Sequence, residues 1–289
     1  MNAAPDPLDR VTVLIVNYNA GAWLARAVAT VRPEGACLPA LRIVDHGSTD
    51  ASLEGLEGPG VSIDRTGRNP GFAAGVNRAA HGTTTEFLLL LNPDCLIQPE
   101  ALARLILELD SDPHAALVSG KVLDPDGREQ RGSRRRLPTP QRVLNELLVK
   151  GNDGVDLTAT TQPDAPVEVE AVSGACMLVR RAAFEEVGGM DPAYPLHFED
   201  LDLFVRLAQA GWTLRWTPEV EIVHAGGRSS TTRPVRVLWA KHRGLWIYLK
   251  RHCAPSFPRW QRPMWLAALI GHALLRTPRA WANARRGRR

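Results

Sequence analysis

The feature that most constrains the fold is an alternation of short apolar runs with segments of helical periodicity, from about residue 10 to residue 120. Val11–Val16 and Glu86–Leu91 are nearly continuous apolar runs, as expected of strands that are covered on both faces. Between such runs, apolar residues recur at helical spacing. Strands that alternate with helices indicate a mostly parallel, doubly wound sheet, so we expect an α/β protein.

The remaining elements follow from the same patterns. Further strands are expected at 41–44, 61–63, 115–119, 167–172, 176–179, 213–216 and 220–223, and helices at 72–80, 99–109, 141–149, 199–210, 235–252 and 262–275. A helix is also expected to start after the second strand, because Ser48, Thr49 and Asp50 are good N-cap residues. Turn signals from residue 124 to residue 166 predict a hairpin and a loop.

Charge is divided unevenly along the chain. Residues 1–221 contain 31 acidic and 20 basic residues, whereas residues 222–289 contain 15 basic residues, no acidic residue and five of the eight tryptophans. This asymmetry points to an anionic partner for the C-terminal segment. Nucleic acid is not expected as that partner, because a nucleic-acid-binding module would usually be basic on its folded body as well.

The spacing of the cysteines and the length of the apolar runs indicate the cellular compartment of the protein. The four cysteines lie far apart and form no CxxC pair, which argues against a zinc site or a disulfide framework. The N-terminus lacks the apolar run of a signal peptide. The run 264–275, interrupted by Gly271 and His272, is shorter than the roughly 20 residues that span a bilayer. These features predict a soluble, cytoplasmic protein.

Polar residues stand where the apolar strands end, at the edge where doubly wound sheets bind ligands. Asp45 follows the strand 41–44, and its carboxylate could accept the ring N–H of a uracil or thymine, or cap its own turn. Asn92-Pro-Asp94 follows the strand 86–91. A lone carboxylate there suits a divalent cation that bridges two phosphates, although Asx-Pro at a strand end is also an ordinary turn.

A glycine-rich segment, Gly67–Asn77, follows the strand 61–63. Gly71 and Gly75 would let the backbone approach a ligand closely, and Asn69 and Asn77 supply amide groups. The segment matches neither the GxxxxGK[ST] phosphate loop nor the GxGxxG fingerprint. A glycine-tolerant helix start is the alternative interpretation.

Two clusters in the second half of the chain carry titratable groups. Glu199, Asp200 and Asp202 fall in the first turn of an expected helix, where acids are favourable, but one face of that turn could also supply a general base. His224 is followed by Ala-Gly-Gly-Arg, a plausible loop for a pyrophosphate. A lone histidine is, however, more often structural than a ligand.

The order of these segments is more specific than any one of them. N-Y-N, V-D-x-G-S-T-D, G-x-N-x-G-F-A-x-G-x-N, L-L-N-P-D, S-G-A, F-E-D-x-D-L and H-x-G-G-x-S occur in sequence between residues 11 and 229. This set resembles the family-2 glycosyltransferases of the GT-A fold, in particular their rhamnosyltransferase-like branch. The resemblance covers about three quarters of the chain, and Lys241–Arg243 and Tyr248–His252 are also similar to that branch.

The resemblance implies an α/β GT-A fold, which is a Rossmann-like, mostly parallel central sheet flanked by helices, with a C-terminal helical, basic extension. The implied catalytic domain spans 1–230, with a nucleotide-binding half at about 10–120 and an acceptor and catalytic half at about 121–230. The extension spans 231–289. The implied activity is that of an inverting glycosyltransferase with Mg²⁺ or Mn²⁺ as cofactor.

The resemblance also assigns roles to individual residues. It implies nucleotide contacts from Asp45, Asn69, Gly71, Gly75, Asn77 and Asn92; metal contacts from Asp94 and His224; an acceptor side at Ser173, Gly174 and Asp202; and catalytic roles for Asp200, as the base, and Glu199. Two positions depart from the family pattern. Asn92 replaces the first acid of the DxD motif and leaves one charge fewer on the cation. His46 stands where Asn or Asp is usual and leaves the base preference open.

The implied donor is a nucleotide-sugar. dTDP-L-rhamnose is favoured by the branch and a UDP-hexose is the alternative. The implied acceptor is a saccharide or lipid-linked saccharide of bacterial surface polysaccharide. A nucleotidyltransferase would want a basic phosphate loop, which Asn17–Gly21 lacks. A non-enzymatic membrane or nucleic-acid-binding module is the remaining alternative.

The basic C-terminal segment suits an interfacial helix on the inner face of the cytoplasmic membrane. Its relevant residues are Trp260, Trp265, Trp281, the apolar run 264–275 and the arginines at 276, 279, 285, 286, 288 and 289. The alternative is that 262–275 packs on the catalytic domain. Nothing in the sequence indicates the oligomeric state.

Overall fold

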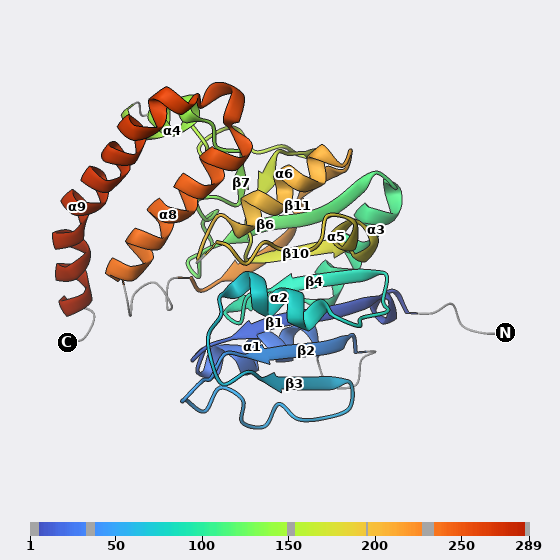
Figure 1. The fold of residues 1–289 in the computed structure, drawn as a ribbon. Helices are drawn as coiled ribbons and strands as arrows, with labels where there is room; N and C mark the ends of the chain where they lie inside the picture. The colour runs from blue at the N-terminus through green and yellow to red at the C-terminus, as the bar shows by residue number, and fades with distance from the viewer. Residues whose placement is uncertain (1–5, 33–37, 149–153, 195, 227–233, 287–289) are drawn as a thin grey trace.

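A computed structural model describes residues 6–32, 38–148, 154–194, 196–226 and 234–286 (Figure 1). Within these residues a mixed sheet of nine strands has the order β3-β2-β1-β4-β10-β6-β11-β5, with β8 paired to β11. Its strands are β1 Val11–Asn17, β2 Ala40–Asp45, β3 Val61–Arg65, β4 Phe87–Leu91, β5 Cys95–Leu96, β6 Ala115–Leu123, β8 Val167–Glu168, β10 Cys176–Arg180 and β11 Thr213–His224. A separate pair consists of β7 Arg134–Arg135 and β9 Ala171–Val172.

Helices cover both faces of the sheet. The helices of the described residues are α1 Ala22–Val31, α2 Phe72–Ala80, α3 Pro99–Ser111, α4 Pro140–Leu148, α5 Arg181–Glu186, α6 Glu199–Gln209, α8 Pro234–His252 and α9 Arg262–Arg286, with short 3-10 turns η1 Pro7–Arg10, η2 Ala254–Ser256 and η3 Arg259–Gln261. The first four strands in the sheet order are parallel, and β10 runs antiparallel between β4 and β6. The expected mostly parallel, helix-flanked sheet is confirmed.

Alternation along β1 explains why the sheet has two cores. Val13 and Ile15 pack with α1 and α3 on one face, and Leu14 and Val16 pack with α2 and α6 on the other. All seven residues of β1 are buried. A continuous apolar strand is what a sheet covered on both faces requires, because each successive side chain meets a different layer of helices.

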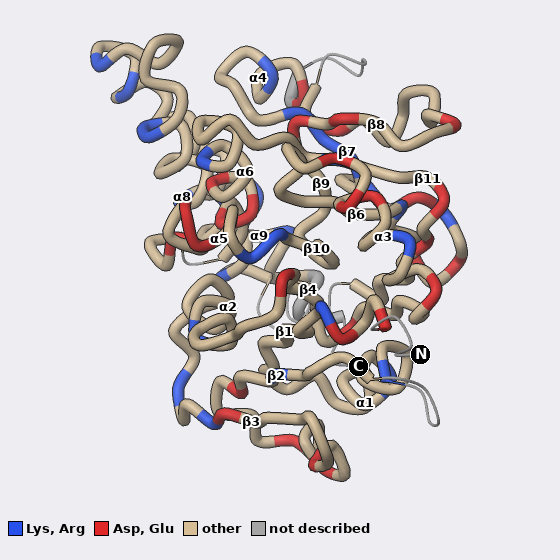
Figure 2. Tube along the Cα trace, turned by 90° about the vertical axis from the view of Figure 1, so that its right-hand side faces the viewer, with Lys and Arg blue, Asp and Glu red and all other residues tan. Residues whose placement is uncertain are grey.

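Helix α8 belongs to the same packed body as the sheet. Its Tyr248 and Leu249 lie in the core that contains α6, and His252 Nε2 lies 2.7 Å from the buried Asp202 Oδ1. The boundary drawn at residue 230 therefore does not separate two units of packing. Helix α9 lies outside α8, at the edge of the molecule (Figure 1). Figure 2 shows the acidic residues spread over the α/β body.

Four expectations about elements were wrong. The single strand expected at 167–172 is two strands, β8 in the nine-stranded sheet and β9 in the separate pair. No helix follows Asp50 in the described residues, because the Asp50 carboxylate accepts hydrogen bonds from Gly21 N and Ser52 N and so closes a turn. The strands expected at 213–216 and 220–223 are one strand, β11, with a register shift between Thr217 and Glu221. Helix α9 runs well past residue 275. No helix in the described part of the chain is long and apolar enough to cross a membrane.

Candidate active site

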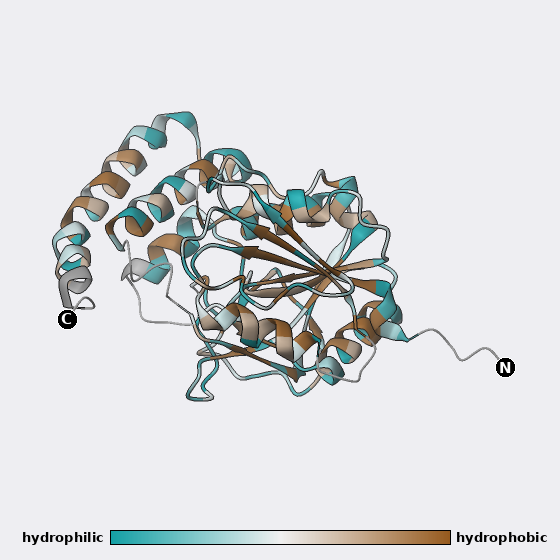
Figure 3. Ribbon diagram, turned by 90° about the horizontal axis from the view of Figure 1, so that it is seen from below, coloured by the Kyte–Doolittle hydropathy of each residue, from teal (hydrophilic) through white to brown (hydrophobic). Residues whose placement is uncertain are grey.

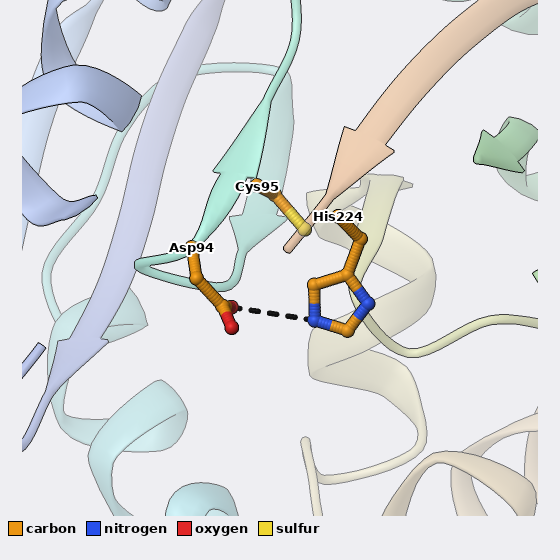
Figure 4. Close-up of side chains that lie close together, drawn as sticks. All are labelled: Asp94, Cys95 and His224. Carbon is orange, nitrogen blue, oxygen red and sulfur yellow. Dashed lines mark ion pairs between the residues drawn. The ribbon is translucent and has the colours of Figure 1, made fainter. Parts of the chain in front are cut away.

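Asp94 and His224 meet at the edge of the sheet, although they are far apart in the sequence. Asp94 follows β4 and precedes the short strand β5, and β5 pairs with the end of β11, where His224 lies opposite Cys95. Ala225 N donates to the backbone oxygen of Asp94. Asp94 Oδ1 and His224 Nε2 are 3.3 Å apart, and each side chain is 16% exposed (Figure 4).

Gln130 holds the ring of His224. Gln130 Oε1 lies 2.7 Å from His224 Nδ1, and Gln130 Nε2 donates to Asp124 Oδ1 over 2.8 Å. Because the amide nitrogen is engaged with Asp124, the amide oxygen accepts from Nδ1–H. This fixes the tautomer in which Nε2 presents a lone pair to Asp94. No motif in the sequence pointed to Gln130.

The Asp94–His224 pair fits a divalent cation. A carboxylate oxygen and an imidazole lone pair that face each other are both acceptors, and a cation between them would bind both. Ligand atoms of Asp94, Cys95 and His224 all lie within 4.8 Å of one another. Cys95 is fully buried, and burial raises the pKa of its thiol well above the usual value. Since Mg²⁺ and Mn²⁺ prefer oxygen and nitrogen ligands to thiolates, Asp94 and His224 are the better candidates.

Asp200 lies in the first turn of α6 and is held by Arg135. Arg135 Nη2 donates to Asp200 Oδ2 over 2.6 Å, and Arg135 Nε donates to Val172 O over 3.1 Å. Asp200 Oδ1 accepts from Leu201 N. The carboxylate therefore has a fixed orientation and keeps lone pairs on Oδ2 for a further donor. Arg135 is a second residue of the site that the sequence did not single out, because its partner lies 65 positions away.

The segment Ser173–Ala175 lies between Asn92, near the Asp94–His224 pair, and Asp200. Asn92 N donates to Ala175 O, and a Cβ at Gly174 would lie 3.0 Å from Asp200 Oδ2. Glycine at 174 is thus required by the close approach of Asp200. Ser173 N donates to Ser133 O, and its hydroxyl oxygen accepts from Ala175 N. The side chain of Asn92 is half-buried, and the structure gives it no hydrogen bond to another described residue.

Glu199 differs from Asp200 in protonation. It is 8% exposed, and its Oε2 has no hydrogen-bond partner among the described residues. Burial and the neighbouring Asp200 raise the pKa of Glu199 to about 8, so Glu199 is a neutral acid at pH 7. Burial and the nearby Lys241 lower the pKa of His197 to about 4, so His197 is neutral as well.

Asp202 does not face the cleft, contrary to its expected place on the acceptor side. Its carboxylate accepts from Tyr194 Oη and from Arg206 Nε and lies 2.7 Å from His252 Nε2. Its side chain is 1% exposed. Asp202 therefore joins α6 to α8, and its burial leaves neither carboxylate oxygen accessible to an acceptor.

Asp45 caps its own turn. Its Oδ1 accepts from Asn17 Nδ2 and Ser48 Oγ, and its Oδ2 accepts from the backbone N–H groups of Gly47 and Ser48. These four bonds and the 3% exposure match the alternative interpretation from the sequence. Any contact between this carboxylate and a pyrimidine ring would require it to give up one of these bonds.

The glycine-rich segment starts helix α2. Asn69 Oδ1 accepts from Gly71 N, and Gly71 is the N-cap with a φ of 103°. A Cβ at Gly75 would lie 2.8 Å from both Val16 and His46 Nε2, so this glycine allows α2 to pack on β1 and β2. His46 is buried beneath α2 rather than open to a ligand.

Asn77 is engaged within the scaffold. Its Nδ2 donates to Met190 O and its Oδ1 accepts from Met190 N, which uses both ends of the amide. Of the residues expected to bind nucleotide, Asn69 and Asn92 are the ones whose side chains keep accessible polar atoms. The structure thus brings together Asp94 with His224, and Gly174 with Asp200, and assigns scaffold contacts to Gly75 and Asn77.

The fold places the molecule in a known structural class. The mannosyltransferase PcManGT from Pyrobaculum calidifontis, solved with GDP-Man and Mn²⁺, matches 98% of this chain and 75% of its own with a TM-score of 0.57 at 19% identity. GalNAc-T7, solved with UDP, GalNAc and Mn²⁺, matches 74% of this chain and 43% of its own with a TM-score of 0.56 at 20% identity. The fold is that of the GT-A glycosyltransferases.

Comparison of sequences identifies the family. The model of glycosyl transferase family 2 matches residues 12–188, and the chain belongs to that family. It is a glycosyltransferase. An N-acetylglucosaminyl-diphospho-decaprenol L-rhamnosyltransferase of Mycobacterium tuberculosis is 29% identical over 97% of this chain and 96% of its own length. Rhamnosyltransferase WbbL of Escherichia coli is 28% identical over 48% of this chain and 52% of its own. The expected rhamnosyltransferase-like resemblance is confirmed.

Proposed function

We propose that this glycosyltransferase moves L-rhamnose from dTDP-L-rhamnose to a hydroxyl group of a lipid-linked saccharide, with inversion at the anomeric carbon. The observation that carries the proposal is the pairing of Asp94 with His224 at 3.3 Å. At the same edge of the sheet Asn92 N donates to Ala175 O, and Gly174, the residue before Ala175, lies against Asp200. The likeness to the mycobacterial rhamnosyltransferase over nearly the whole of both chains supports the sugar and the class of acceptor. A UDP-hexose is the alternative donor.

Asp200 is the proposed general base. The acceptor hydroxyl would hydrogen-bond to the free lone pair of Asp200 Oδ2 and lose its proton to it as the oxygen attacks the anomeric carbon. Arg135 holds the carboxylate in place, and neutral Glu199 adds no second negative charge beside it. One attack opposite the leaving group inverts the configuration, which matches a site with a single ionised base.

Asp94 and His224 are the proposed ligands of a divalent cation. When bound, Mn²⁺ or Mg²⁺ would neutralise the charge that develops on the leaving nucleoside diphosphate. The imidazole nitrogen in the donor set favours Mn²⁺, since Mg²⁺ prefers oxygen ligands. The neighbouring Asn92 side chain, which has no hydrogen-bond partner among the described residues, is the proposed contact to the donor.

The acceptor is proposed to be presented at the inner face of the cytoplasmic membrane, with the protein bound peripherally there. Two facts support this. The named relative acts on a diphospho-decaprenol, and the C-terminal segment of this chain combines basic residues with tryptophans. Because the proposed acceptor is a lipid-linked saccharide, we propose that the reaction belongs to the assembly of bacterial surface polysaccharide.

A nucleotide-sugar panel tests the donor and the metal together. Thermal unfolding would be followed with dTDP-L-rhamnose, UDP-hexoses and GDP-mannose, each with Mn²⁺, Mg²⁺ or EDTA. A ligand at about 100 times its Kd adds about 2.7 kcal/mol to the free energy of unfolding, so binding is measurable. We expect dTDP-L-rhamnose with Mn²⁺ to give the largest shift in Tm, and Asp94→Ala to abolish the contribution of the metal. Equal shifts with every sugar nucleotide would contradict the assigned donor.

A further inference from the structure

Helix α9 is apolar on two opposite faces, and only one of these faces is covered. Leu269 and Ala273, on the inner face, are buried against the rest of the protein. His272 Nδ1 lies 2.8 Å from His242 Nε2 of α8 on the same side. A contiguous apolar face left exposed on a protein surface often marks an interaction site. The uncovered face therefore requires an explanation.

The outer face consists of exposed apolar residues that recur at three- and four-residue intervals. They are Met264, Ala267, Ala268, Leu274, Leu275 and Pro278. Leu275 is 79% exposed and Met264 68%, the largest fractions among the large apolar residues of this helix. A Cβ added at Gly271, which lies between them, would meet no atom within 4 Å. Figure 3 shows apolar turns along α9, the outermost helix.

Basic residues flank this face. Arg279 is exposed next to Pro278 and one turn from Leu275, Arg276 is exposed on the flank that carries His272, and no acidic residue occurs after Glu221. An apolar strip beside arginines matches the boundary between the acyl chains and the headgroups of an anionic lipid bilayer. A second copy of this chain would bring a like-charged segment against it, with no acid in either segment to pair with the arginines.

We propose that the outer face of α9, defined by Met264, Ala267, Ala268, Leu274, Leu275 and Pro278, docks the protein on an anionic lipid membrane, with the helix axis parallel to the membrane plane. The helix is too polar to span the bilayer. The proposal rests on the proposed function in one respect, because the membrane is where a lipid-linked acceptor would be found.

The docking face is connected through α8 to the start of α6, where Glu199 and Asp200 lie. Helix α9 packs on α8, and Gly244 of α8 packs so closely on α6 that a Cβ there would lie 2.9 Å from His197 O. Residue 197 is three positions before Asp200. Membrane contact through α9 therefore sets the position of the proposed base relative to the lipid surface, which a flexible anchor could not do.

Flotation with lipid vesicles tests the docking face. The probe is a vesicle of phosphatidylglycerol and phosphatidylcholine, compared with one of phosphatidylcholine alone. We expect the protein to float with the anionic vesicles and to be released by salt. Leu275→Ser should weaken binding about tenfold, because a buried leucine side chain is lost from the interface. Combining it with Met264→Ser and Leu274→Ser should weaken it further. Arg276→Gln and Arg279→Gln should each weaken it about fivefold.

Matched controls lie on α3, across the molecule from α9 (Figure 1). Leu107 is 64% exposed and Arg104 is an exposed arginine, so Leu107→Ser and Arg104→Gln change the same chemistry elsewhere. Both should bind vesicles as the unmodified protein does. Circular dichroism would establish that each variant is folded.

Three results would overturn the docking face. They are failure of the unmodified protein to bind anionic vesicles, equal binding by Leu275→Ser and Leu107→Ser, and a dimer in sedimentation that the α9 variants dissociate. Sugar transfer to a water-soluble acceptor separates this proposal from the enzymatic one. If transfer persists without vesicle binding, docking fails and the proposed function stands. If the protein binds vesicles but transfers no sugar, the docking face stands and the proposed function fails.

Discussion

Asp200 and Glu199 are neighbours at the start of α6, but their carboxyl groups differ in protonation and therefore in chemical role. Asp200 is paired with Arg135 and its side chain is 16% exposed, whereas Glu199 is buried and neutral at pH 7. The sequence could predict that acids gather here, because they form the first turn of a helix. It could not tell their protonation states apart, because these depend on burial and on Arg135, which arrives from another part of the chain.

Replacement of Asp200 tests the base directly. Asp200→Asn should lower kcat by about 10²- to 10⁴-fold, because the acceptor hydroxyl loses its proton acceptor. Nucleotide binding, measured by calorimetry, should be unchanged. Asp126→Asn removes a carboxylate from an exposed turn and serves as the control. An Asp200→Asn enzyme with near-normal kcat would rule out Asp200 as the base.

Glu199 gives a prediction for pH and stability. Its pKa of about 8 lies above the ordinary value of 4.5, so the folded protein retains a proton that the unfolded chain releases. The free energy of unfolding should therefore fall as the pH rises from about 4.5 to about 8. Glu199→Gln, which resembles the protonated acid, should lose less stability over this range. Tm values at several pH values would show a gap between the two proteins that widens with pH, and a constant gap would contradict the assignment.

At the scale of elements, the sequence was most informative where an element is long and regular. The strands β1 and β4 and the helices α3 and α6 lie where apolar periodicity predicted them. The helix expected after Asp50 is missing because local side-chain hydrogen bonds favour a turn, which the identity of good N-cap residues cannot distinguish from a helix start. Gly75 and Asn77 were interpreted as ligand contacts, but helix packing and the backbone of Met190 account for them.

Substitutions at Gly244 of α8 and Gly271 of α9 test how these two helices are packed. A Cβ at Gly244 would lie 2.9 Å from His197 O and from Phe198 Cδ2, so Gly244→Ala should lower the free energy of unfolding by about 1–3 kcal/mol. It should also reduce activity, since the start of α6 must shift. At Gly271 the added methyl group meets open space, so Gly271→Ala should stabilise α9 by about 0.5–1 kcal/mol. Urea unfolding measures both, and effects of the same sign would contradict this packing.

At the scale of the whole molecule, the structure divides the basic C-terminal segment into two parts that pack differently. The basic segment is not one extension. Helix α8 completes the core of the catalytic body through Tyr248 and Leu249, whereas α9 stands outside it with an apolar outer face. Trp265 was expected at a membrane surface, but it packs edge-on against Phe257. Trp260 remains exposed, as an interfacial residue would be.

The pairing of Asp94 with His224 likewise belongs to the whole fold, because it depends on β5 and β11 meeting at the sheet edge. Asp94 was proposed as a metal contact from its place after a buried strand and from family resemblance, and His224 from the resemblance. The fold brings them to 3.3 Å and adds Gln130, which orients the histidine. No local pattern could have identified Gln130, because its role is defined by a contact across 94 positions.

The central claim is metal-assisted, inverting transfer of a sugar from a nucleotide donor. The most direct test is incubation of the protein with dTDP-L-rhamnose, Mn²⁺ and an N-acetylglucosaminyl-diphospho-lipid, followed by NMR of the product. We predict a rhamnosyl product whose anomeric configuration is opposite to that of the donor, formed by the unmodified protein and not by Asp94→Ala or after EDTA treatment. A product with retained configuration, or one formed equally by Asp94→Ala, would contradict this account.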